Sequence, residues 1–196
     1  MKKVEVPYLV FEVKGKLFMI DAYFSKKVEK IEHTSVLIRK LDKSLPKTAE
    51  NPLPKMLDEE NIESFLKDAF EKIYELSNRK FDERLKHIRK WNIHRIIGIS
   101  SGFKKHKEKE EELAKENREA LLALALLQEI LRVKNPIELK EVTIKPVEWR
   151  YYALEIRNNE VYDEKGNKDL IYTELLKRDK GISQALYALE YSQHAT

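Results

Sequence analysis

The hydrophobic residues near the start of the chain predict a β-hairpin. Val4–Val13 is rich in the β-branched and aromatic side chains that strands favour. The polar segment Lys14-Gly15-Lys16 follows, and its glycine can adopt the positive φ angle of a tight turn. The apolar segment Leu17–Tyr23 is then the return strand, and Thr34–Leu41 is predicted to be a third strand.

The pattern changes to a helical one in the middle of the chain. Apolar residues recur at intervals of three and four over Asp58–Ser77, which predicts an amphipathic helix that Asn78 ends or interrupts. A second, shorter helix is predicted over Phe81–Trp91. The compact apolar run Ile93–Ser100 predicts an inner strand.

The longest predicted helix runs from Phe103 to about Lys134, and we expect the chain to be organised around it. Its second half contains eight consecutive apolar residues, Ala120–Leu127. Such a run covers every face of a helix, so we expect it to be buried on all sides. It is too short for a bilayer, which needs about 20 apolar residues. It is either the core helix of a monomer or an interface between two copies.

The C-terminal part mixes strand and helix signals. Strands are predicted over Ile137–Trp149, interrupted at Pro146, over Tyr151–Ile156, and at Val161-Tyr162. Two short helices are predicted over Asp169–Arg178 and Ile182–Tyr191.

Together these elements predict one α+β domain over residues 1–196. Antiparallel hairpins or a sheet would pack around the long helix, next to a helical middle segment and short C-terminal helices. The proline-containing segment 42–57 is expected to be a connector.

The composition narrows the class of protein. Charged residues make up 37% of the chain, against roughly 25% in ordinary soluble domains, and this excess of Lys and Glu is typical of proteins from hot environments. There is no cysteine, which excludes disulfides, thiolate nucleophiles and Cys-ligated metals. No uninterrupted apolar segment of signal-peptide type follows the N-terminus, so we expect a cytoplasmic protein that is not in a membrane. No nucleotide-binding glycine motif is present, and no cofactor is expected.

The segment from Arg79 to Arg95 is the most basic part of the chain, with His87, Trp91 and His94 interleaved. Its cations are Arg79, Lys80, Arg84, Lys86, Arg89, Lys90 and Arg95. Cations that neutralise phosphates and rings that stack on bases are the two parts of a nucleic-acid site. The alternative interpretation is a solvated helix face with its tryptophan in the core.

A second candidate surface is the aromatic segment near the C-terminus. It comprises Trp149, Arg150, Tyr151, Tyr152 and Arg157. Trp, Tyr and Arg are the usual anchor residues of interfaces, so this segment could stack on bases or contact a partner. Alternatively, the tyrosines close the edge of the core.

Two sets of residues suggest nuclease chemistry. Glu12-Val13-Lys14 resembles one piece of the restriction-endonuclease-like signature, which implies a divalent metal and a further carboxylate. Glu5 and Asp21 are the candidates for that carboxylate. A charged hairpin face explains the same residues. Separately, His87 and His94 could act as acid and base in a metal-independent ribonuclease, although surface histidines would look the same.

Overall, the sequence predicts a non-catalytic interaction or nucleic-acid-associated module, with RNA favoured over DNA. It would be a homodimer or a subunit of a larger assembly, such as an accessory subunit of a ribonucleoprotein or a CRISPR-type defence complex. The alternatives are a metal- or His-dependent nuclease, and a structural homo-oligomer that binds no nucleic acid.

Overall fold

The computed structural model describes residues 3–96 and 102–191. Its strands are β1 (Lys3–Val13), β2 (Lys16–Asp21), β3 (Ile38–Lys40), β4 (Ile144–Arg157) and β5 (Glu160–Asp163). Its α-helices are α1 (Ile62–Ile96), α2 (Phe103–Leu131), α3 (Leu170–Arg178) and α4 (Lys180–Tyr191). Three 3-10 helices are η1 (Phe24–Lys26), η2 (Ile31–Leu37) and η3 (Pro136–Glu141). This confirms the α+β class.

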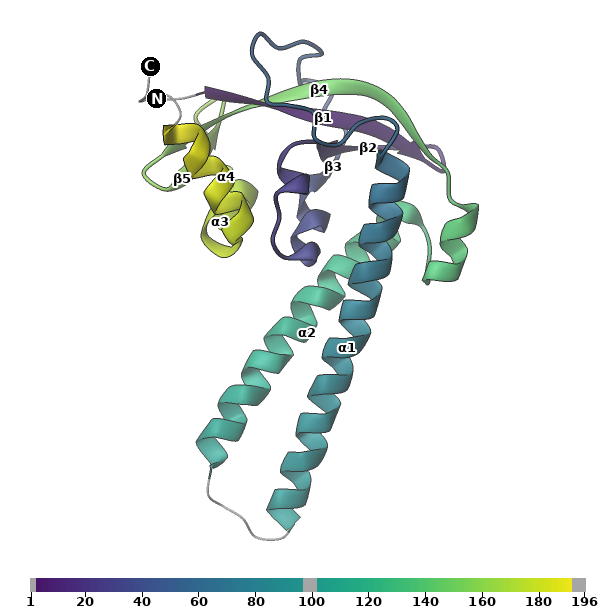
Figure 1. The fold of residues 1–196 in the computed structure, drawn as a ribbon, viewed down its shortest axis with the longest axis vertical. Helices are drawn as coiled ribbons and strands as arrows, with labels where there is room; N and C mark the ends of the chain where they lie inside the picture. Colours follow the sequence, from purple (N-terminus) through teal and green to yellow (C-terminus); the bar gives the residue numbers. More distant parts are fainter. Residues whose placement is uncertain (1–2, 97–101, 192–196) are drawn as a thin grey trace.

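The strands form one curled antiparallel sheet in the order β3-β2-β1-β4-β5, and α1 and α2 project from it as a long helical hairpin (Figure 1). The predicted N-terminal hairpin is confirmed, because β1 pairs with β2 from Tyr8 opposite Asp21 to Val13 opposite Lys16. Gly15 in the turn has a φ of 79°, as its position predicts.

Strand β1 lies at the centre of the sheet, and its two faces contribute to two cores. Leu9, Phe11 and Val13 pack with α1 and the C-terminal half of α2. On the opposite face, Tyr8 and Val10 belong to a core that includes α3 and α4. The period of two along a strand sends alternate residues to opposite faces, so a nearly continuous apolar strand fits a sheet covered on both sides.

Helix α1 differs from the prediction, because its 35 residues are continuous. Asn78 does not end it, and Ile93–Ile96 is helical rather than a strand. No glycine or proline occurs within α1, and an internal asparagine costs a helix less than about 1 kcal/mol. Packing against α2 stabilises the continuous helix at Asn78, where local propensity does not decide between a helix and a break. The rest of the predicted strand, 97–100, lies outside the described residues.

Helix α2 begins where predicted and ends at Leu131, and Arg132 follows it in the left-handed conformation. The expectation that Ala120–Leu127 is buried on all sides is wrong. Leu121, Leu122 and Leu126 are 49%, 61% and 40% exposed. The reason is that α1 and η2 cover only one side of α2.

Two predicted β segments are shorter or differently placed. Of Thr34–Leu41, only β3 is a strand, because the first half of the segment belongs to η2, where the Ser35 hydroxyl donates to the Glu32 carbonyl. Residues 136–141 form η3, so the start of the predicted strand Ile137–Trp149 is wrong. Its remainder and the predicted strand Tyr151–Ile156 are one strand, β4. Pro146 pairs with Phe11 beside a register shift, a position at which a strand tolerates proline.

The other predicted segments of the C-terminal part and the connector agree with the structure. Most of segment 42–57 is irregular, and α3, α4 and β5 lie close to their predicted positions. Among the described residues, no helix is both long enough and apolar enough to cross a membrane.

Candidate functional site

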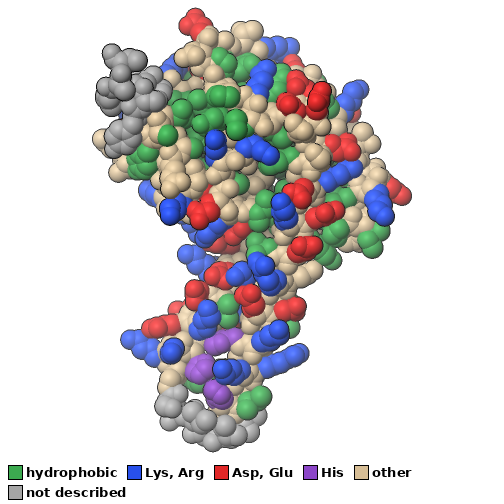
Figure 2. Space-filling model, in the orientation of Figure 1, with side chains coloured by type: hydrophobic (Ala, Val, Ile, Leu, Met, Phe, Trp, Pro, Cys, Tyr) green, Lys and Arg blue, Asp and Glu red, His purple; other side chains and the backbone are tan. Residues whose placement is uncertain are grey.

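The predicted basic segment lies on the distal half of α1, in the part of the helical hairpin that projects from the sheet (Figures 1 and 2). The N-terminal half of α2 runs beside it and adds further lysines. We call residues 84–96 of α1 and 102–109 of α2 the tip. In Figure 2, blue Lys and Arg side chains surround the purple histidines there.

The tip carries a strong net positive charge. Residues 84–109 contain nine cations, namely Arg84, Lys86, Arg89, Lys90, Arg95, Lys104, Lys105, Lys107 and Lys109. Glu108 is the one acidic residue in this range, so its formal charge is +8 (9 minus 1). The whole chain carries +4, so the rest of the chain carries −4 (4 minus 8). The net charge of the whole chain is therefore mild although its charge is distributed very unevenly between the tip and the rest.

Most of these cations have no partner within the described chain. Arg84 donates to Glu110 at 2.8 Å, and Lys109 lies 3.2 Å from Glu112. The other seven are exposed and form no ion pair or side-chain hydrogen bond with a described residue. They are Lys86, Arg89, Lys90, Arg95, Lys104, Lys105 and Lys107. Four of the seven cations predicted for the site belong to this group.

The predicted cations nearer the sheet have structural roles. Lys80 lies 2.7 Å from Glu116 and so joins α1 to α2, and Arg79 lies 4.0 Å from Glu83. Ser77 and Asn117 are buried in the same part of the hairpin. The interior of the hairpin is thus partly polar between the sheet and the tip.

An aromatic cluster joins the two helices at the tip. The ring of Trp91 lies 4.6 Å from that of His106 and 5.5 Å from that of Phe103, measured between centroids. His87 Nε2 lies 3.1 Å from the His106 carbonyl oxygen, and the His94 ring lies 5.4 Å from the His106 ring. The basic pattern in the sequence indicated the three rings on α1, whereas only helix packing brings Phe103 and His106 beside them.

The electrostatic environment favours the neutral form of His106. Loss of hydration lowers the pKa of its imidazole, and the charges of His94, His87, Lys90 and Lys105 lower it further. A neutral ring can stack on Trp91 without adding another charge to a crowded set of cations.

A groove of about 400 Å³ opens at this cluster. It is lined by His87, Ile88, Trp91, Phe103, His106, Lys107, Glu110 and Glu111. Its walls are mainly aromatic and aliphatic, and Lys107, one of the unpaired cations, lies among them. A flat apolar group that carries negative charge beside it would fit these walls.

The second predicted cluster does not form one open surface. Arg150 is 9% exposed, and its guanidinium donates to the Lys43 and Leu45 carbonyls. Tyr151 is also buried, and its backbone N–H donates to the Pro46 carbonyl. These two residues therefore hold the connector against β4.

The other members of that cluster lie apart from one another. Trp149 Nε1 donates to Glu59 at 2.6 Å, and Lys55 Nζ lies 4.1 Å from the centre of the ring. The Tyr152 hydroxyl donates to Asp169, and Arg157 is paired with Glu155. A role for these residues in stacking or partner binding stays a prediction.

The carboxylates of the nuclease alternative are separated by the strand register. Asp21 lies opposite Tyr8, four residues from Glu12 along β1, which is roughly 13 Å in a strand. Glu5 accepts from the Asn51 N–H. Among the described residues, no group of three or more His, Asp or Glu side chains is arranged to hold a metal ion.

Asp21 instead belongs to a buried network that the sequence analysis did not anticipate. Tyr172 of α3 donates to Asp21 Oδ2, and the Tyr8 hydroxyl contacts that of Tyr172. Asp21 Oδ1 accepts from the N–H groups of Tyr23 and Phe24. Burial raises the pKa of Asp21 to about 6, although these hydrogen bonds act against it.

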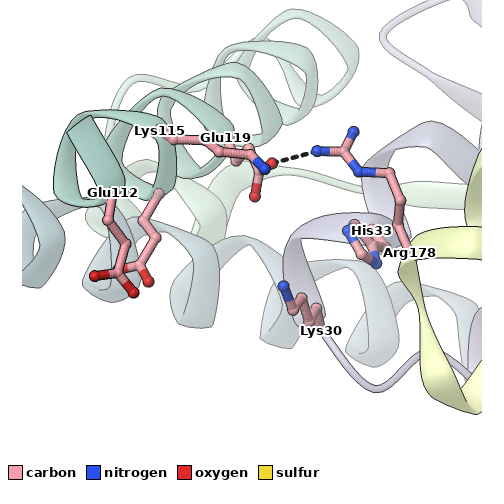
Figure 3. A pocket seen from close by; sticks show the side chains of 7 residues that line it. Lys30, His33, Glu112, Lys115, Glu119 and Arg178 are labelled. Atoms are coloured by element: carbon pink, nitrogen blue, oxygen red, sulfur yellow. Dashed lines mark hydrogen bonds and ion pairs between the residues drawn. The ribbon is translucent and has the colours of Figure 1, made fainter. Parts of the chain in front are cut away.

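A mixed-charge pocket of about 350 Å³ lies between α2, η2 and α3 (Figure 3). It is lined by Lys30, His33, Glu112, Lys115, Glu116, Glu119 and Arg178. Arg178 points at Glu119 across a 2.6 Å contact (Figure 3). Its three lysine and arginine residues balance its three glutamates, so this pocket has less attraction for a polyanion than the tip.

Comparison with protein-family models, curated proteins and solved structures found no match.

Proposed function

We propose that this protein is a non-catalytic nucleic-acid-associated module that contacts phosphate groups with the tip of its helical hairpin. The observation that supports this best is the charge distribution. Seven exposed cations at the tip have no ion-pair partner among the described residues, and the rest of the chain carries a formal −4. RNA is our first expectation for the nucleic acid, ahead of DNA.

The physical basis is counterion release. Each phosphate that a lysine or arginine neutralises frees condensed cations from the nucleic acid, so affinity falls as salt rises. A projecting pair of helices can bring such cations to a polyanion while the negatively charged remainder stays away from it (Figure 1).

Fluorescence anisotropy tests this proposal. Labelled single-stranded RNA and duplex DNA would be titrated at several salt concentrations. The variant Lys86→Gln/Lys90→Gln/Lys104→Gln/Lys107→Gln should lose about tenfold or more in affinity and show a shallower dependence on salt. Each substitution keeps a long polar side chain at an exposed position, so the fold should be unaffected.

The matched control removes the same charge from exposed lysines of the sheet end, in the variant Lys16→Gln/Lys40→Gln/Lys140→Gln/Lys145→Gln. It should bind as the wild type does. Equal affinities for the wild type and the tip variant would overturn the proposal.

A partner role is part of the proposal, either in a homodimer or as an accessory subunit of a ribonucleoprotein or CRISPR-type complex, at a cytoplasmic location. The exposed side of α2 supports the homodimer. Leu121, Leu122 and Leu126 are exposed there, between Arg118 and Glu129, which have no side-chain partner among the described residues. Burial of these leucines against a second copy would remove apolar surface from water.

This face is complementary to itself in the antiparallel direction. Take a two-fold axis that passes midway between positions 123 and 124. Arg118 then meets Glu129 of the second copy, Leu122 meets Ala125, and Leu121 meets Leu126. Opposite charges therefore face each other, the large Leu122 faces the small Ala125, and each pair occurs twice, as in an isologous interface.

A His-dependent ribonuclease is the second candidate function. It is favoured by the fact that His87 and His94 both contact His106. Gel analysis of the anisotropy samples would reveal shortened RNA, which His94→Ala and His106→Ala should abolish. Intact RNA in the wild-type samples would remove this candidate.

A further inference from the structure

Phe103 is an exposed aromatic ring in the middle of a cationic surface. It is 60% exposed at the first turn of α2, and its ring lies against that of Trp91 on α1. Contact with phosphates requires only cations and hydrogen-bond donors. Unlike the exposed apolar side chains of α1, Phe103 lines a groove together with further rings, so its exposed ring is available to an apolar ligand group in that groove.

The groove beside Phe103 is suited to a flat ring. Trp91 and His106 both line it, with ring centroids 4.6 Å apart and planes tilted by 33° to each other. Lys107 follows Phe103 by four residues and therefore lies on the same face of α2, where it also lines the groove. A cation is thus placed one helical turn from the ring.

The acidic residues of the groove limit where a phosphate can lie. Glu110 is occupied by Arg84, whereas Glu111 is exposed without a partner among the described residues. A phosphate would therefore avoid the side near Glu111 and lie toward the N-terminal end of α2, where Lys104 and Lys105 are exposed.

We propose that the tip groove binds an unpaired base of single-stranded nucleic acid. The base stacks on Phe103 beside Trp91, and Lys107 with the neighbouring lysines contacts the flanking phosphates. This inference rests on the proposed function and makes it narrower. Bases in a duplex are already stacked and present only their edges, whereas every unpaired base has a free face.

The test is the variant Phe103→Ala, measured by anisotropy on a short single-stranded RNA and on an RNA duplex of the same length. The wild type should prefer the single strand. The variant should lose roughly tenfold in affinity for the single strand. Its affinity for the duplex and the slope of its salt dependence should not change, because no cation is removed.

Phe81→Ala is the matched control. Phe81 is an equally large ring that is 51% exposed on α1, outside the groove. It should leave both affinities unchanged. In a Trp149→Phe background, Trp91 is the remaining tryptophan, and its fluorescence should change when the single strand binds.

The outcomes separate this inference from the proposed function. If Phe103→Ala binds the single strand as tightly as the wild type does, the stacking site is overturned, while salt-dependent binding would still support phosphate contact by the tip. Equal losses on the single strand and the duplex would also overturn it. If neither RNA binds at low salt, both proposals fail.

Discussion

Asp21 is a carboxyl group buried between the N-terminal hairpin and α3, and both of its oxygens accept hydrogen bonds. Oδ1 accepts from two backbone N–H groups and Oδ2 accepts from Tyr172. Burial outweighs these bonds and raises its pKa from 3.8 to about 6. The cost of this buried charge should therefore be visible in the stability of the protein.

Proton binding to Asp21 determines whether the free energy of unfolding rises or falls with pH. Between about pH 4 and pH 6 the folded state holds a proton on Asp21 more often than the unfolded state does, so the free energy of unfolding falls as pH rises through this window. The contribution is about 3 kcal/mol, from a shift of about two pKa units. Asp21→Asn should remove this part of the pH dependence, because the Asn amide does not titrate. The variant should still fold, because Asn can keep the chain of hydrogen bonds with the direction of the Tyr172 hydroxyl reversed.

Urea unfolding of the wild type and of Asp21→Asn at about pH 4 and about pH 7 measures the effect. The wild type should lose more stability between the two pH values than the variant does. Parallel behaviour of the two proteins would contradict the assignment of this titration to Asp21.

At the level of elements, the distal hairpin is held mainly by polar and aromatic contacts. Lys80 with Glu116, Arg84 with Glu110, and His87 with the His106 carbonyl join α1 to α2 there. Buried aliphatic contacts are concentrated nearer the sheet, where α1 and α2 share a core with β1. A change in the charge of side chains should therefore alter the stability of the tip more than it alters the stability of the remaining parts of α1 and α2.

His106 makes this response depend on pH. Its folded pKa is lowered by loss of hydration and by the positive groups around it, so the unfolded segment takes up a proton first as pH falls. The stabilisation that neutral His106 provides is present above about pH 6.5 and is lost as pH falls below it. We expect amide protection in the tip to decrease between about pH 7.5 and about pH 5.5.

Hydrogen exchange, corrected for the intrinsic effect of pH, measures this change, with residues 62–73 of α1 as the internal reference. The variant His106→Gln cannot be protonated at this position and should show a smaller change. A uniform loss of protection along the whole of α1 would count against a local origin at His106.

At the level of the whole molecule, the proposed antiparallel dimer would place the two tips at opposite ends of the assembly. Leu122→Glu should abolish the dimer by placing charge in the apolar face. Arg118→Glu should weaken dimerisation by about tenfold, since two symmetry-related pairs are lost. The double variant Arg118→Glu/Glu129→Arg should restore it, because it reverses each pair without changing its geometry.

Sedimentation or light scattering over a range of protein concentrations measures the dimer. A wild type that remains monomeric throughout the range would contradict the interface. So would a double variant that is no better than Arg118→Glu alone, because the two charges would then not face each other.

The physical scale of each feature explains how much of it could be read from the sequence. The β1–β2 hairpin and the helical nature of α2 depend on residues close together in the chain, so local patterns predicted both. The continuation of α1 through Asn78 depended on a partner helix, and local propensity there is too weak to decide. The basic half of the tip on α1 could be predicted, since charge is counted directly.

By itself, the sequence determined the charge, the α+β class, and the alternation that makes β1 an apolar strand. Only the tertiary structure placed Phe103 and His106 against Trp91, joined Asp21 to Tyr172, and left Leu121, Leu122 and Leu126 uncovered. Periodicity along a chain reports which side chains share a face. Which other segment covers that face is decided by packing between residues far apart in the chain, and no local pattern records it.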